Sequence, residues 1–298
     1  MKILVLGGSY FLGKHFVNQA KEIHEITVFN RGTRPLQDPK IREIHGDRHN
    51  LEDLAKLHGQ SFDAVVDFCA YQQGDILSVF TSLDSKISQY LFISTCDIYE
   101  RGLGRVLDEN APMETRVFAG EAGDYIKGKV ALEQELVQCS KNHQVAYTSI
   151  RPVFIYGMDN YAPREGIYFH WIWQAGQILH PEDATGEFQM VYVLDVVSAI
   201  LKTLGNQKAY NQAYNLAPDT MQSYASFAQA LKQACPIPFE TVPVSVQMVQ
   251  EKNIPLPFPL TKEESNWYNG EKVLAFLDGY TPLEEGLKET ICAMEVRG

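Results

Sequence analysis

The sequence predicts an α/β fold in which a doubly wound parallel sheet is followed by a smaller C-terminal domain. Over the first half of the 298 residues, short apolar runs alternate with amphipathic stretches, as strands and helices do when they alternate along a chain. The apolar runs are nearly continuous, which is typical of parallel strands buried on both faces. Right-handed crossovers then place helices on both faces, which makes the sheet Rossmann-type.

The predicted elements follow in order up to about residue 151. Strands are expected at residues 2–6, 25–30, 41–45, 62–70, 90–95 and 145–151. Helices are expected at residues 11–21, 51–57, 75–83 and 124–142.

The character of the sequence changes after residue 151. Residues 157–188 are rich in aromatic residues, Gly and Pro, and their periodicity is weak. Further on we expect strands at 188–193 and 213–218, helices at 194–204 and 223–234, an extended connector at 254–260, and a last helix from about residue 282. We therefore predict one domain over residues 1–156, to which later segments at about 188–217 return, and a second over residues 157–298.

Composition narrows the class of protein. No apolar run is long enough to span a membrane, and the first strand follows Met1 so closely that we expect no signal peptide. The net charge of -11 argues against nucleic acid as a partner, although a local basic patch stays possible. Five scattered cysteines without a C-x-x-C pattern favour free thiols in the cytoplasm. No metal is expected, because His45 and His49 have no third ligand nearby.

The stretch "VLGGSYFLG" joins the first strand to the first helix and resembles a phosphate-binding loop. Gly7 and Gly8 suit the tight turn, and Gly13 lets the helix pack closely on the strand. Tyr10 replaces the glycine that allows close approach to a pyrophosphate. The loop and helix start, Ser9, Phe11 and Leu12 included, still offer backbone amides to an anion. The alternative is a glycine-rich turn without a ligand.

The second strand ends "VFNRGTR". An NAD site normally places Asp or Glu here to bind the ribose, whereas an arginine accommodates the 2′-phosphate of NADP. Asn30 stands in place of the acid, and Arg31 and Arg34 follow it. We therefore expect NAD(P) as cofactor, with NADP favoured over NAD. The alternative is that both arginines are solvated loop residues.

Tyr125 and Lys129 are four residues apart and so share one face of the predicted helix. A neighbouring ammonium favours the phenolate of a tyrosine, which lets it exchange a proton with a substrate while hydride moves to or from a nicotinamide. The spacing also occurs at Tyr10/Lys14 and Tyr268/Lys272. Context favours Tyr125, because the preceding strand ends with hydroxyl residues at the sheet edge where ligands bind.

Together these motifs resemble the extended or atypical branch of the short-chain dehydrogenase/reductase superfamily, the NAD-dependent epimerase/dehydratase group. The resemblance covers almost the whole chain, and its motifs occur in the family's order: "VLGGSYFLG", "VFNRG", "GDR", "FISTCDIY", "YIKGK", "IRPVFIYG", "FQMVYVLDV" and "AYNLA". It implies that residues 1–156 bind the dinucleotide and that residues 157–298 mostly bind substrate. Atypical members with a "GGTRFIG" loop carry arginine where this chain has Tyr10.

The resemblance also implies roles for single residues. It makes Thr95, Tyr125 and Lys129 the catalytic triad, and it adds further cofactor and substrate residues. On the cofactor side these are Asp47 near the adenine with Arg48 beside it, Ala70, and the Pro152–Phe154 backbone flanking the nicotinamide. On the substrate side they are Cys96, Asp97, Arg164 and Gln189. "STCDIY" resembles the "STDEVY" of sugar-nucleotide 4,6-dehydratases, with Cys96 replacing an acidic residue; alternatively, Asp97 bonds only to local backbone.

We therefore expect an NAD(P)-dependent epimerase, reductase or dehydratase that acts on a sugar or sugar nucleotide. The alternative is a non-catalytic, RNA-associated or redox-sensing member of the same group. The resemblance further implies a homodimer formed through the helix that carries Tyr125. Aromatic residues at 161, 168, 169, 171 and 173 either stack on a base or fill a core, and we expect the two tryptophans among them in the core.

Overall fold

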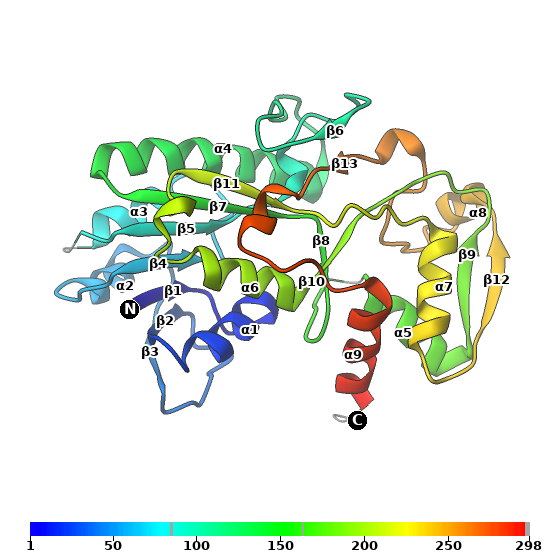
Figure 1. Ribbon diagram of the computed structural model, residues 1–298, viewed down its shortest axis with the longest axis horizontal. Helices are drawn as coiled ribbons and strands as arrows, with labels where there is room; N and C mark the ends of the chain where they lie inside the picture. The colour runs from blue at the N-terminus through cyan, green and yellow to red at the C-terminus, as the bar shows by residue number, and fades with distance from the viewer. Residues whose placement is uncertain (84–85, 163, 296–298) are drawn as a thin grey trace.

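A seven-stranded parallel sheet forms the centre of the protein (Figure 1). The computed structural model describes residues 1–83, 86–162 and 164–295. The strand order is β11-β7-β5-β4-β1-β2-β3, and every neighbouring pair is parallel. The strands are β1 (Lys2–Leu6), β2 (Glu25–Asn30), β3 (Ile41–His45), β4 (Ala64–Asp67), β5 (Gln89–Ile93), β7 (Ala146–Pro152) and β11 (Gln212–Leu216). The predicted fold class is confirmed.

Helices cover both faces of this sheet because successive side chains of each strand point to opposite sides. Ile3 and Val5 of β1 pack in the cluster that contains α1 (Phe11–Ala20) and α6 (Val193–Thr203). Leu4 and Leu6 pack in the cluster with α3 (Asp75–Ser82) and α4 (Gly120–His143). Each of these four side chains is fully buried, and such burial contributes about 1.5–3 kcal/mol per side chain. The short α2 (Leu51–Leu54) follows β3.

The remaining elements lie beyond the carboxyl end of the sheet, at the right of Figure 1. Two parallel pairs form there: β8 (Phe154–Tyr156) with β10 (Met190–Tyr192), and β9 (Gln177–Pro181) with β12 (Glu240–Val244). The helices are α5 (Glu165–Ala175), α7 (Tyr224–Ala234), α8 (Val246–Glu251) and α9 (Leu283–Glu295). A small pair joins β6 (Val106–Leu107) to β13 (Trp267–Tyr268). The domain boundary at residue 156 stays a prediction.

Several predicted elements differ from the structure. The strand expected over 62–70 ends at Asp67, and an irregular segment follows it. The helix that carries Tyr125 begins at Gly120, earlier than the predicted residue 124. Its first turn was missed because Gly120 and Gly123 have low helix propensity. The strand expected over 188–193 is limited to Met190–Tyr192. Trp173 is 39% exposed, so the expectation that it lies in the core is wrong.

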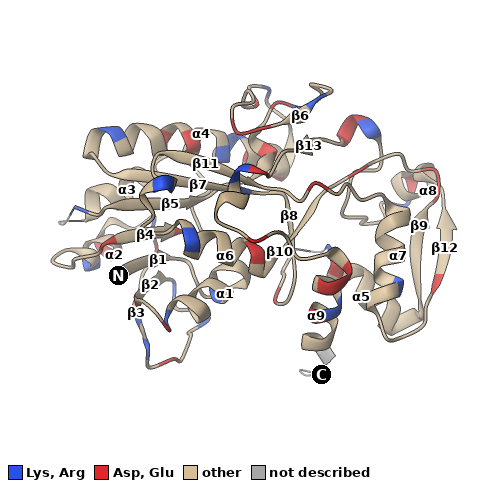
Figure 2. Ribbon diagram, in the orientation of Figure 1, with Lys and Arg blue, Asp and Glu red and all other residues tan. Residues whose placement is uncertain are grey.

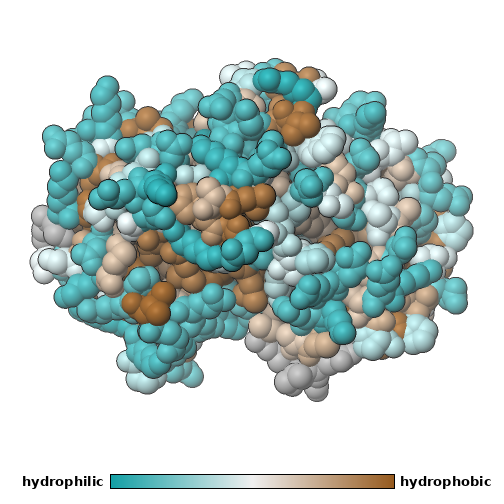
Figure 3. Space-filling view, in the orientation of Figure 1, coloured by the Kyte–Doolittle hydropathy of each residue, from teal (hydrophilic) through white to brown (hydrophobic). Residues whose placement is uncertain are grey.

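One face of the molecule is mostly hydrophilic, with hydrophobic groups gathered near its middle (Figure 3).

Within the described residues no helix is long and apolar enough to cross a membrane. All five cysteines lie in the described part of the chain, and each is a free thiol.

Candidate functional site

A cavity of about 820 Å³ opens at the carboxyl ends of β1, β4, β5 and β7. Between β1 and β4 the strand order reverses direction, and ligands of open α/β sheets bind in the crevice at such a point. The walls include the turn after β1, the segment after β5, two side chains of α4 and the segment after β7. From the predicted site they contain Gly7, Gly8, Ser9, Tyr10, Phe11, Leu12, Gly13, Arg31, Thr95, Cys96, Asp97, Tyr125, Lys129, Pro152, Phe154, Arg164 and Gln189.

The turn after β1 is shaped as a cradle. Gly7 and Gly8 have φ angles of +92° and +84°, which favour glycine. A Cβ on Gly13 would lie 2.8 Å from the Cα of Gly8, so the start of α1 packs directly on the turn. No side chain caps α1, and the first amides of a helix have no partner within it. These amides are therefore available to an anion in the cavity.

Tyr10 lies at the mouth of this cradle. Its ring stacks on Tyr161, with 5.0 Å between the ring centroids. The guanidinium carbon of Arg34 lies 3.9 Å from the centroid of the Tyr10 ring. The ring is 40% exposed. Tyrosine is therefore accommodated here by stacking at the edge of the cavity.

Thr95, Tyr125 and Lys129 come together in the cavity. Thr95 is the second residue after the end of β5, and its hydroxyl hydrogen-bonds to Tyr125. Lys129 lies one helical turn after Tyr125, with its Nζ 5.8 Å from the centre of the tyrosine ring. The Lys129 ammonium donates to the carbonyl oxygens of Ala70 at 2.9 Å and Ile93 at 2.8 Å. These bonds hold the ammonium between β4, β5 and α4.

The environment shifts the titration of both groups. Burial, and next the charge of Asp97, raise the pKa of Tyr125, while the hydrogen bond from Thr95 lowers it. Burial lowers the pKa of Lys129 to about 8, against the opposing effect of the Asp67 carboxylate. Burial therefore favours the protonated form of Tyr125, and Lys129 supplies a buried cation near neutral pH.

The competing tyrosine–lysine pairs do not form such a site. Lys14 forms an ion pair with Asp159 at 2.9 Å and does not line the cavity. Lys272 donates to Gln212 at 2.8 Å and to the Ala213 carbonyl at 2.9 Å. Tyr268 itself lines the cavity, which makes it a useful comparison for Tyr125.

Five residues predicted on the cofactor side do not line the cavity. Asn30 caps its own turn by accepting from the Gly32 amide at 2.8 Å. Arg34 stacks on Tyr10, and Asp47 accepts from the His49 amide at 2.9 Å. Ala70 contributes its carbonyl to Lys129. Arg48 is only 7% exposed and its guanidinium binds Asp67, so the structure turns it into the protein rather than toward a cofactor.

The predicted substrate residues divide into two groups. Asp97 and Arg164 present charge to the cavity, and Arg164 is anchored by donating to the Ile155 carbonyl at 2.9 Å. The Cys96 thiol donates to the Arg151 carbonyl at 3.0 Å and is buried. The side-chain amide of Gln189 binds the Tyr268 backbone, accepting from its N–H at 2.8 Å and donating to its carbonyl at 3.0 Å. The side chains of Cys96 and Gln189 therefore shape the wall.

Sequence reasoning missed part of the cavity wall. The additional lining residues include Tyr71, Arg101, Glu187, Glu264, Asn266 and Tyr268. Arg101 lies four residues after Asp97, with 3.9 Å between their charged atoms, a spacing that could have suggested the pair. Apart from the Tyr268/Lys272 spacing, residues 264–268 carry no local signal, because it is the return of the chain that brings them to the site.

A family profile, two curated relatives and a solved structure resemble this chain. The profile of the "NAD dependent epimerase/dehydratase family" matches residues 75–217. The chloroplast stem-loop binding protein of 41 kDa b from Arabidopsis thaliana is 30% identical over 250 residues, which cover 78% of this chain. UDP-glucose 4-epimerase from Lactobacillus helveticus is 24% identical over 173 residues, or 51% of this chain. The matches span 63% of the first relative and 51% of the second, less than two thirds of either.

A solved structure shares the whole fold. UDP-glucose 4-epimerase from Thermotoga maritima, solved with UDP-glucose, superposes with a TM-score of 0.81 at 18% identity. The match covers 100% of this chain and 99% of that one.

Proposed function

We propose that this chain, whose residues 75–217 match the profile of the NAD-dependent epimerase/dehydratase family, is a nicotinamide-dependent epimerase, reductase or dehydratase of a sugar nucleotide. The observation that carries the proposal is the meeting of Thr95, Tyr125 and Lys129 in one cavity with the glycine turn of β1. The Thermotoga and Lactobacillus proteins named above act on UDP-sugars, which supports the substrate class.

The cavity suits a dinucleotide. The close packing of Gly13 on Gly8 leaves the first amides of α1 at the cavity wall, where they would hold a pyrophosphate. Pro152 and Phe154 also line the cavity, where they would flank the nicotinamide. When bound, the nicotinamide accepts a hydride from the sugar carbon or returns one to it.

The chain's own residues handle the proton. Tyr125 acts as the phenolate, which takes the proton from the sugar hydroxyl as the carbon is oxidised and returns it on reduction. The Lys129 cation, held by the Ala70 and Ile93 carbonyls, favours the phenolate form of Tyr125 that accepts this proton. Thr95 hydrogen-bonds to the same substrate oxygen and orients it. Asp97 and Arg164 contact the rest of the substrate.

The test uses the purified protein with UDP-glucose, UDP-galactose and UDP-glucuronic acid as probes, and NAD or NADP as cofactor. Products are followed by chromatography and mass spectrometry, and the cofactor is identified from the denatured protein. Tyr125→Phe is expected to abolish turnover. Tyr268→Phe, from a competing motif in the same cavity, is expected to retain it. Turnover that survives Tyr125→Phe would contradict the assigned role.

We further propose that NADP is preferred over NAD. Arg31 lines the cavity, Arg34 stacks at its mouth, and no acid ends β2; a guanidinium suits a 2′-phosphate. Calorimetric titration of both cofactors tests this: Arg31→Ala and Arg34→Ala should weaken NADP binding and leave NAD binding nearly unchanged. Tighter binding of NAD by the unaltered protein would refute the preference and leave the enzyme proposal intact.

A second candidate function is RNA binding, favoured by the similarity to the Arabidopsis stem-loop binding protein. Lys and Arg are interspersed with Asp and Glu across the view of Figure 2, and the net charge is -11. Both features weaken an electrostatic footprint for RNA. Fluorescence polarisation with a stem-loop RNA at physiological salt tests whether the protein binds RNA, and we expect no binding.

Two finer proposals concern the state of the protein in the cell. We propose a homodimer formed through α4, which sedimentation at micromolar concentration tests; a monomer would refute it. We also propose a cytoplasmic location, which the free thiols support; fractionation of the source cells tests it.

A further inference from the structure

The segment between β4 and α3, residues 68–74, carries the carbonyl that holds the candidate catalytic lysine. This segment, here called the crossover, contains no helix or strand. Its Ala70 carbonyl accepts from Lys129 at 2.9 Å. Because no regular backbone ladder fixes the crossover, side chains must hold it in shape.

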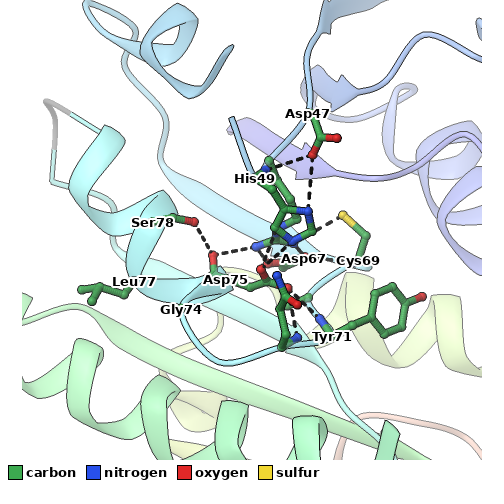
Figure 4. A network of polar contacts seen from close by, with 12 residues as sticks. Asp47, His49, Asp67, Cys69, Tyr71, Gly74, Asp75, Leu77 and Ser78 are labelled. Carbon is green, nitrogen blue, oxygen red and sulfur yellow. Dashed lines mark hydrogen bonds and ion pairs between the residues drawn. The ribbon is translucent and has the colours of Figure 1, made fainter. Parts of the chain in front are cut away.

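Arg48 anchors both ends of the crossover. Figure 4 labels Asp67, Cys69, Tyr71 and Asp75 in the network that surrounds it. Its two terminal nitrogens donate to the carboxylate of Asp67 at 2.9 and 3.0 Å. One of them also donates to the Asp75 carbonyl at 2.7 Å, and the other reaches the Cys69 sulfur at 3.4 Å. Two-point pairing of this kind fixes orientation as well as distance.

The two carboxylates pass this anchorage to the crossover backbone. Asp67 accepts from the Cys69 amide at 3.0 Å. Asp75 accepts from the Tyr71 amide at 2.8 Å and from the Gln72 amide at 3.2 Å. Ala70 thus lies between two amides that are bound to carboxylates around Arg48.

Helix α4 packs directly on the crossover next to Lys129. A Cβ on Gly128 would lie 2.1 Å from the Tyr71 carbonyl oxygen, so glycine alone permits this approach. About two turns after Gly128, Glu135 accepts from the Gly74 amide at 2.6 Å and the Leu77 amide at 2.7 Å. The crossover and the lysine therefore share one rigid contact.

We propose that Arg48 is a positioning residue for Lys129, acting through Asp67, Asp75 and the Ala70 carbonyl. The inference rests on the proposed function, because Lys129 matters to catalysis only there. Arg48 does not line the cavity, so it acts from behind the site.

The experiment compares Arg48→Lys with the unaltered protein. Lysine keeps the charge but loses the two-point contact with Asp67. Asp75→Asn is a second variant that disturbs the bonds to the amides of Tyr71 and Gln72. It also removes the charge 3.8 Å from Arg48 Nε, but Arg48 keeps its two-point contact with Asp67. Leu231→Ala is the control, since Leu231 is a fully buried residue of α7 and its truncation lowers stability away from α4.

The readout is trace acetylation of each lysine, quantified by peptide mass spectrometry, together with hydrogen exchange of residues 68–74. No cofactor or substrate is needed, so failure here is distinguishable from failure of the proposed function. We expect acetylation of Lys129 to rise about tenfold in both variants, the order expected when a charge-assisted hydrogen bond is lost. Other lysines, and Lys129 in Leu231→Ala, should stay within about twofold.

Two results would overturn the proposal. Acetylation of Lys129 could stay at the wild-type level in folded Arg48→Lys and Asp75→Asn protein. Alternatively, hydrogen exchange of the crossover could rise while Lys129 stays protected, which would show that the lysine does not depend on the crossover. If Arg48→Lys does not fold, Asp75→Asn decides.

Discussion

Replacing Lys129 with methionine should change how the stability of the protein depends on pH. Lys129 is 3% exposed, and burial lowers its pKa from 10.5 to about 8. Between these two pH values the unfolded chain carries a proton on Lys129 that the folded chain has released. The unfolded state then binds more protons, so raising the pH stabilises the folded wild-type protein.

The size of the effect follows from the same two values. The pKa is lowered by 10.5 - 8, about 2.5, and each unit corresponds to about 1.4 kcal/mol. The free energy of unfolding of the wild type minus that of Lys129→Met should therefore increase by about 3 kcal/mol between pH 8 and pH 10.5. Taking the difference between the two proteins cancels the titration of the groups they share.

Urea unfolding followed by circular dichroism at several pH values measures this difference. Lys127→Met is the matched control, because Lys127 lies on the same helix but is exposed to water; its curve should lack the rise. A flat difference curve for Lys129→Met would refute the reasoning, since it would show that the ammonium is as well solvated in the folded protein as in the unfolded chain.

Three further predictions concern the frame of the site. Arg151→Met leaves the buried carboxylate of Glu133 without its two-point partner, so unfolding in urea should show a loss of about 3–5 kcal/mol that Glu133→Leu in the same chain largely restores. Gly13→Ala places a Cβ 2.8 Å from the Cα of Gly8, so calorimetry should show weaker binding of NAD and a lower melting temperature. Tyr10→Ala removes an exposed stack on a guanidinium, so the free energy of unfolding should fall by no more than about 1 kcal/mol.

The sheet was predictable because its signal is local. A strand such as β1 is apolar at every position after Lys2, since both faces are covered, and the glycines that follow it mark the turn. Helix α5 escaped prediction for the opposite reason. Its aromatic residues lie on several sides of the helix, with Tyr168 and Phe169 buried while Trp173 is exposed. The sequence therefore shows no apolar stripe with helical periodicity.

The site was predictable where motifs lie within one element and unpredictable where the chain returns. Tyr125 and Lys129 share a helix face, and the spacing alone brings them together. Arg48 contacts residues 19 and 27 positions away, so its pairing with Asp67 and Asp75 depends on how β3 and β4 are placed. Tyr268 is held at the cavity by the pairing of β13 with β6 and by Gln189, which binds its backbone. No local pattern reveals these long-range contacts.

The central claim is that Tyr125 exchanges a proton with a sugar whose hydride goes to a nicotinamide in the same cavity. The most direct measurement mixes NAD- or NADP-loaded protein with each UDP-sugar and records the absorbance of reduced nicotinamide. The account predicts a transient rise in the wild type and none in Tyr125→Phe, with equal cofactor affinity by calorimetry. A rise of the same size and rate in Tyr125→Phe would contradict it.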